Sequence, residues 1–107
     1  MYCDYQRLYV GENGYVIKCK NCHYYQVAFT SILLNLNQQG FDLLQQTLEL
    51  KCAGCDYLSN NTIKNIIIQT SSANVCLLLT RNEAFDLFHM LEEADTESKT
   101  LEMLKAV

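Results

Sequence analysis

Two pairs of cysteines with the same C-x-x-C spacing constrain this chain more than any other feature. Cys19 and Cys22 lie in CKNCHYYQ, and Cys52 and Cys55 lie in CAGCDYLS. A C-x-x-C turn lets two sulfurs reach one ion, and zinc binds four thiolates tetrahedrally at about 2.3 Å. The four cysteines therefore predict a structural zinc site. The 29 residues between the pairs are acceptable because the entropy cost of loop closure grows slowly with length.

The length and composition predict one soluble domain spanning residues 1–107. Half of the residues are apolar and 19% are charged, which is typical of a globular chain. The first residues, MYCDYQRLYV, lack the apolar run of a signal peptide, and no stretch is long enough to span a membrane. We therefore expect a cytoplasmic protein. There the six cysteines stay reduced, which favours metal binding or redox chemistry over disulfides.

The formal charge of −4 is concentrated in the last quarter of the chain. From Arg81 onward there are three basic and seven acidic residues, so this segment carries all of the net charge. We interpret it as the solvated face of a helix. A nucleic acid would be repelled by such a segment, so the charge distribution disfavours nucleic acid as a partner.

The first half of the chain predicts strands followed by a helix. Asn13-Gly14 in GENG favours a hairpin whose second strand runs into Cys19. HYYQVAFTSILLNL is rich enough in aromatic and β-branched residues for one or two more strands. If Tyr24 and Tyr25 lie in a strand, one faces the core and the other the surface. Asn37 is the expected N-cap of a helix over QQGFDLLQQTLEL.

The second half predicts the same order of elements. Asn60-Asn61 is the expected turn before NIIIQT, a buried strand, and VCLLL is typical of a central strand. Thr80 and Glu83 form the pattern of a capping box. The helix that follows should face the core with one apolar side. ADTESK should separate it from a short final helix, TLEMLKAV. The residues expected on that side are Phe85, Phe88, Leu91 and Ala94.

ILLNLNQQGFDLL and CLLLTRNEAFDLF resemble each other at a constant offset of 44 residues. Each predicts a strand, a cap and an amphipathic helix. The chain is therefore interpreted as a pseudo-repeat of two strand–strand–helix halves that share one antiparallel sheet. The predicted fold class is α+β, a small zinc-ribbon-like sheet with two main helices on one face.

Other residues leave alternatives open around the zinc site. Cys3 or His23 could replace a ligand, and Lys18, Lys20 and Lys51 would offset the net charge of −2 left by zinc with four thiolates. A C-x-x-C pair, Cys52 and Cys55 in particular, could instead carry thiol–disulfide chemistry. Iron suits four thiolates as well. Cys76 is expected to be a small buried hydrophobe, and His89 a helix-boundary or core residue.

The sequence contains no pattern that indicates an enzyme. It has no Gly-rich phosphate loop and no Ser/His/Asp arrangement, and neither histidine has a neighbouring nucleophile. We expect a non-enzymatic interaction or accessory module with a protein partner, either monomeric or homodimeric. A nucleic-acid-binding zinc ribbon is the first alternative, because lysines and tyrosines surround the first cysteine pair. A thiol-redox protein is the second.

Two segments resemble a family of small uncharacterised bacterial proteins, known only as a domain of unknown function. These segments are NGYVIKCKNCHYYQVAFTSILLNL and IIIQTSSANVCLLLTRNEAFDLFHMLEEA. The similar features are the hairpin that enters the first C-x-x-C pair, the QVAF strand with its apolar successor, and the strand–helix unit ending in LEEA. The resemblance covers most of the chain and implies no activity.

Overall fold

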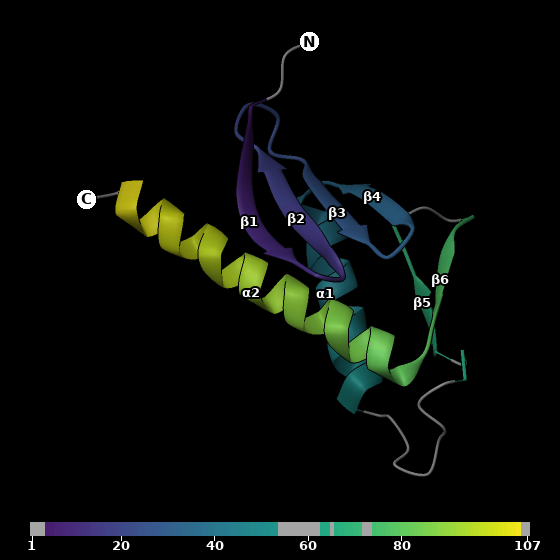
Figure 1. Cartoon of the computed structure of the whole chain (residues 1–107). Coiled ribbons are helices and arrows are strands. Elements are labelled where there is room, and N and C mark those ends of the chain that lie inside the picture. The colour runs from purple at the N-terminus through teal and green to yellow at the C-terminus, as the bar shows by residue number, and fades with distance from the viewer. Residues whose placement is uncertain (1–3, 54–62, 65, 72–73, 106–107) are drawn as a thin grey trace.

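The computed structural model describes residues 4–53, 63–64, 66–71 and 74–105, and it has an α+β architecture (Figure 1). A four-stranded antiparallel sheet has the order β1-β2-β3-β4, and β5 and β6 form a separate antiparallel pair. Two helices complete the fold. In chain order the elements are β1 (Tyr5–Gly11), β2 (Gly14–Cys19), β3 (Tyr25–Phe29), β4 (Ile32–Leu36), α1 (Gln38–Ala53), β5 (Ile66–Gln69), β6 (Cys76–Leu79) and α2 (Arg81–Lys105).

The predicted hairpin joins β1 and β2, but its turn lies one residue earlier than expected. Gly11 pairs with Gly14, so Glu12 and Asn13 form the turn and Gly14 already belongs to the strand. Gly14 has φ +156°, a backbone conformation that other residues rarely adopt. A Cβ atom there would also collide with the carbonyl oxygen of Ala28 on β3. The glycine is therefore required by the close approach of β3 as well as by its backbone conformation.

HYYQVAFTSILLNL forms two strands, β3 and β4, which confirms the higher of the two expected numbers. Tyr25 is buried, whereas Tyr24 is 49% exposed, as the alternation of side chains along a strand predicts. The Tyr25 ring stacks on Phe41 of α1, with 4.2 Å between the ring centroids. This contact fixes the start of α1 over the sheet.

Both predicted helix caps are confirmed. The Asn37 side chain accepts a hydrogen bond from the Gly40 amide at 2.8 Å. At α2 the capping box is complete, because the Thr80 amide donates to the Glu83 carboxylate at 2.9 Å and the Glu83 amide donates to the Thr80 hydroxyl at 3.1 Å. Each cap satisfies first-turn amides that have no partner within the helix.

The predicted break at ADTESK is wrong, because α2 continues without interruption to Lys105. The segment contains no proline or glycine to end the helix. Ala94 and Ser98 keep the buried face continuous, and Asp95 and Lys99 form an i,i+4 ion pair at 2.8 Å on the outside. The buried face also differs from the expected one. Phe85 and Phe88 are half-buried, and the fully buried positions are Ala84, Leu87, Leu91 and Ala94.

NIIIQT forms a strand, β5, as predicted, but VCLLL does not become a central strand. β6 pairs only with β5 in the two-stranded sheet, so the two halves of the chain do not share one sheet. Cys76 is exposed rather than a buried hydrophobe, because its neighbour Leu77 faces the core and successive strand residues alternate. The turn predicted at Asn60-Asn61 lies outside the described residues.

One hydrophobic cluster joins the sheets and the helices. Both helices contribute to it, and the four-stranded sheet contributes the face that carries Val16, Tyr25 and Val27. Both helices therefore lie on one face of the four-stranded sheet, as predicted. Among the described residues, neither helix is long and apolar enough to cross a membrane.

Candidate metal centre

The first C-x-x-C pair lies in the turn that connects β2 to β3. Cys19 is the last residue of β2, and its amide donates to the Tyr24 carbonyl at 2.9 Å. The His23 amide donates to the Cys19 carbonyl at 3.0 Å, and His23 adopts a left-handed conformation with φ 64°. The Cys22 amide points at the Cys19 sulfur, with 3.4 Å between nitrogen and Sγ. The turn therefore already supplies one amide hydrogen bond to a cysteine sulfur.

The two cysteines of this turn differ in exposure. Cys19 has no exposed surface, yet it does not belong to the hydrophobic cluster that joins the helices to the sheets. Cys22 is exposed. A structural zinc site encloses its ligands, and a fully buried thiol reacts poorly with solutes. The environment of Cys19 therefore suits a structural ligand better than a redox-active thiol.

Charged side chains from both ends of the chain converge beside this turn. The Nζ atom of Lys18 lies 3.7 Å from a carboxylate oxygen of Glu102 on α2. The Nζ atom of Lys20 lies 3.7 Å from a carboxylate oxygen of Asp4. Together with Cys19, the two lysines line a small cavity of about 80 Å³ between the end of β2 and α2. Lys18 is only 14% exposed, so its charge is screened less than that of a surface lysine. These lysines would offset the negative charge of thiolates bound to a metal.

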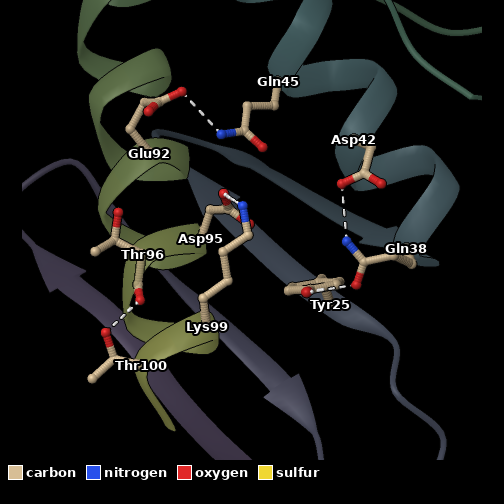
Figure 2. A network of polar contacts seen from close by, with 9 residues as sticks. All are labelled: Tyr25, Gln38, Asp42, Gln45, Glu92, Asp95, Thr96, Lys99 and Thr100. Carbon is tan, nitrogen blue, oxygen red and sulfur yellow. Dashed lines mark hydrogen bonds and ion pairs between the residues drawn. The ribbon is translucent and has the colours of Figure 1, made fainter. Parts of the chain in front are cut away.

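Cys52 of the second C-x-x-C pair lies at the opposite end of the molecule from this turn. Cys52 is half-buried near the C-terminal end of α1 and packs against the hydrophobic cluster, and Cys55 lies outside the described residues. The other end of α1 is the one near the first pair, because the Tyr25 hydroxyl donates to Gln38 at 2.9 Å (Figure 2). A helix rises about 1.5 Å per residue, so Cys52 lies roughly 21 Å along α1 from Gln38.

The structure thus brings Cys19 and Cys22 together but does not bring Cys52 to them; Figure 1 shows the β2–β3 turn and the end of α1 on opposite sides of the molecule. Within the described residues, no group of three or more histidine, cysteine, aspartate or glutamate side chains is placed to hold a metal ion. The set of four cysteines stays a prediction, since Cys55 is not among those residues.

The alternative ligands occupy different positions. His23 is exposed in the same turn as Cys22. Cys3 lies outside the described residues, but the Lys20 amide donates to the carbonyl of Asp4, its neighbour in the chain, at 2.8 Å. This bond holds the start of β1 beside the first pair. His89 is exposed on α2, with its ring 5.9 Å from that of Phe88, so the expectation of a helix-boundary or core histidine is wrong.

The position of Cys52 also bears on redox chemistry. Reactive cysteines commonly lie at helix N-termini, where the helix dipole stabilises the thiolate. Cys52 lies in the last turn of α1, where the dipole has the opposite sign. This location weakens the case for thiol–disulfide exchange by the second pair.

A network of polar contacts between the helices was not foreseen from the sequence (Figure 2). Gln45 of α1 donates to Glu92 of α2 at 2.9 Å, and Lys99 donates to Asp95 at 2.8 Å. The hydrogen bond that Lys99 donates to Asp95 raises the pKa of Lys99, with the negative charge of Asp95 as the second cause. The Gln45–Glu92 bond joins the two helices and the Lys99–Asp95 pair lies within α2, so the arrangement is that of a structural contact. No residue spacing in the sequence marks the Gln45–Glu92 pair.

Comparison with known proteins places the chain in one family. The model of a family of unknown function, DUF6686, matches residues 1–107, so the chain belongs to that family. No curated protein matches the chain, and no solved structure matches it.

Proposed function

We propose, from membership of a family without an assigned activity, that the chain is a non-enzymatic interaction or accessory module stabilised by zinc at the β2–β3 turn. The observation that carries this proposal is the hydrogen bond from the Cys22 amide to the buried Cys19 sulfur. Amide hydrogen bonds stabilise the thiolate form, which is the form that binds zinc.

Cys19 and Cys22 supply two of the four ligands that a structural zinc ion needs. The sequence favours Cys52 and Cys55 as the other pair. The fold favours ligands nearer the turn, because the Lys20–Asp4 hydrogen bond holds the segment after Cys3 against it and His23 is part of it. We therefore propose that Cys19 and Cys22 are ligands in either arrangement, with Cys3 and His23 as the candidates that the fold favours for the remaining positions.

Zinc at this position would stabilise the fold as a whole. A structural zinc ion contributes roughly 10–16 kcal/mol of binding coupled to folding in zinc-finger peptides. The total stability of a small domain is only about 5–15 kcal/mol. The turn lies where β1, β2 and the end of α2 meet, so a metal ion there would hold both ends of the chain to the sheet. We expect removal of the metal to lower the melting temperature by tens of degrees or to unfold the protein.

The test is elemental analysis of protein purified without added metal, for the parent and for single Cys→Ser variants. We expect about one zinc per chain in the parent and none in Cys22→Ser. Cys76→Ser is the matched control, because Cys76 is exposed on β6, in the separate two-stranded sheet. A well-folded parent without metal, or equal loss of zinc in Cys22→Ser and Cys76→Ser, would refute the site.

Three further variants identify the other ligands. Loss of zinc in Cys3→Ser with retention in Cys52→Ser would assign the site to the N-terminal end of the chain. The reverse result would restore the set of Cys19, Cys22, Cys52 and Cys55. If the site is at the N-terminal end, His23→Ala tests whether the fourth ligand is this histidine or another cysteine. Loss of zinc in His23→Ala would identify the histidine.

A further inference from the structure

The face of the four-stranded sheet that points away from the helices carries a continuous apolar row. Val10 pairs with Tyr15, Tyr15 with Ala28, and Ala28 with Leu33, so one residue from each strand contributes. Directly paired residues of an antiparallel sheet point to the same side. Val10 is 62% exposed and Leu33 is 52% exposed. None of these four residues belongs to the hydrophobic cluster that the helices cover.

A second row lies beside the first on the same side of the sheet. Arg7 pairs with Ile17, Ile17 with Gln26, and Gln26 with Asn35. We call the two rows together the open sheet face. Its eight residues are Val10, Tyr15, Ala28, Leu33, Arg7, Ile17, Gln26 and Asn35. Arg7 is the single charged residue among them, so the face is nearly neutral although the chain carries a net charge of −4.

Most of the acidic residues lie on the other side of the molecule, and Glu12 in the β1–β2 turn borders the open sheet face. Of the twelve in the chain, two are on α1 and seven are on α2. Both helices pack on the inner face of the sheet. Two copies of the chain repel each other wherever their helices meet. If the open sheet faces meet instead, the layers follow in the order helix, sheet, sheet, helix, with about 10 Å between neighbouring layers. The distance between the two helical layers then exceeds the Debye length of about 8 Å at physiological salt.

We propose that the open sheet face binds a second copy of this chain, sheet against sheet, across a two-fold axis. In such an arrangement the same patch serves on both copies, so each apolar row covers the other. The inference names the partner of the interaction module proposed above. It rests on that part of the proposed function and does not depend on the zinc site.

Self-association fits this face better than binding to a nucleic acid does. A nucleic-acid surface needs several cations to neutralise phosphates, and the open sheet face offers Arg7 alone. The two rows provide fewer than the 20–30 residues per side of a standard interface. We therefore expect a weak dimer that dissociates on dilution through the micromolar range.

The experiment is sedimentation velocity of the full chain over a concentration series, with the parent and three variants. Leu33→Glu and Leu33→Lys each place a charge, of opposite sign, in the apolar row. Leu50→Glu is the matched control, because Leu50 is 74% exposed on α1, in the helical layer. We expect the parent and Leu50→Glu to dimerise, and both Leu33 variants to sediment as monomers with an unchanged circular dichroism spectrum.

Three results would overturn the inference. They are a parent that is monomeric at all concentrations, a dimer that persists in both Leu33 variants, and equal loss of the dimer in Leu50→Glu. The zinc proposal is judged separately from the same preparations. Leu33→Glu should keep the metal content of the parent while losing the dimer, whereas Cys22→Ser should lose the metal.

Discussion

The segments β4–α1 and β6–α2 have the same order of elements but different surroundings. Each consists of a strand, a capping residue and a helix, with Asn37 and Thr80 as the caps. β4 closes one edge of a four-stranded sheet, whereas β6 belongs to a two-stranded pair. A two-stranded pair is marginal by itself, so β5 and β6 depend on the hydrophobic cluster. Local structure is thus repeated, but the tertiary role of each copy is not.

The two segments are equivalent at an offset of 43 residues, one fewer than the identical letters Phe-Asp-Leu suggest. The caps stand 43 positions apart. The buried residues then coincide in pairs, which are Leu36 with Leu79, Phe41 with Ala84, Leu44 with Leu87, and Leu48 with Leu91. At an offset of 44 the buried and exposed positions of the two strands fall out of phase, because a shift of one residue reverses the side that each residue faces. Burial and capping define the repeat, and the shared letters do not.

The largest effect should distinguish these two registers. Phe41 is fully buried and stacks on Tyr25, so Phe41→Ala should cost about 3–5 kcal/mol of unfolding free energy. Phe85, its partner at an offset of 44, is half-buried and lies under the Arg81 side chain, 5.6 Å from the guanidinium carbon. Phe85→Ala should cost about 1 kcal/mol. Urea denaturation of both variants measures the difference. Equal costs would mean that the 44-residue register describes the packing.

The caps should show a smaller effect that is similar in both halves. Asn37→Ala removes the acceptor for the Gly40 amide, and Thr80→Ala removes the acceptor for the Glu83 amide. Each should lower the unfolding free energy by about 0.5–2 kcal/mol. Gln39→Ala is the control, because Gln39 is exposed in the first turn of α1. If only one of the two cap variants were destabilised beyond the control, the halves would not be equivalent at their helix starts.

Local signals in the sequence predicted most of the elements, and the errors come from tertiary contacts. The caps and the alternation of Tyr24 and Tyr25 depend on neighbouring residues alone. By contrast, the single helix α2 depends on its packing, since ADTESK has a weak apolar pattern and is held by Ala94 and Ser98 against the core. The apolar run VCLLL could not reveal which of its residues faces the core. Cys76 was misplaced for that reason.

The candidate site was predictable in part. The spacing of Cys19 and Cys22 correctly marked a turn, and in the structure the Cys22 amide is directed at the Cys19 sulfur. The distance between the two pairs depends on the direction of α1, which carries Cys52 away from the β2–β3 turn. Nothing in the spacing of the four cysteines reports that direction. The burial of Cys19 and the ion pair of Lys18 with Glu102 also follow from the tertiary fold alone.

The smallest effect should be a dependence on pH that only the second half possesses. The first turn of α1 has no acidic residue, whereas Glu83 lies in the first turn of α2. The pKa of Glu83 is lowered, chiefly by the hydrogen bond from the Thr80 amide and then by the one from Lys64, at 2.9 Å and 3.0 Å. A depressed pKa in the folded state means that the folded state binds the proton less tightly than the unfolded chain does.

The stability that Glu83 contributes is therefore present above its unfolded pKa of about 4.3, and it is lost as the pH falls through the lower folded value. Glu83→Gln should lower the unfolding free energy by about 0.3–1 kcal/mol at pH 7 and by progressively less below pH 4. Thermal unfolding of the parent and the variant across that range measures the difference, with Glu93→Gln as the exposed control on the same helix. A destabilisation by Glu83→Gln that stays constant down to pH 3 would mean that the side chain acts through packing, and the charge in the capping box would then contribute nothing to the difference between the two helices.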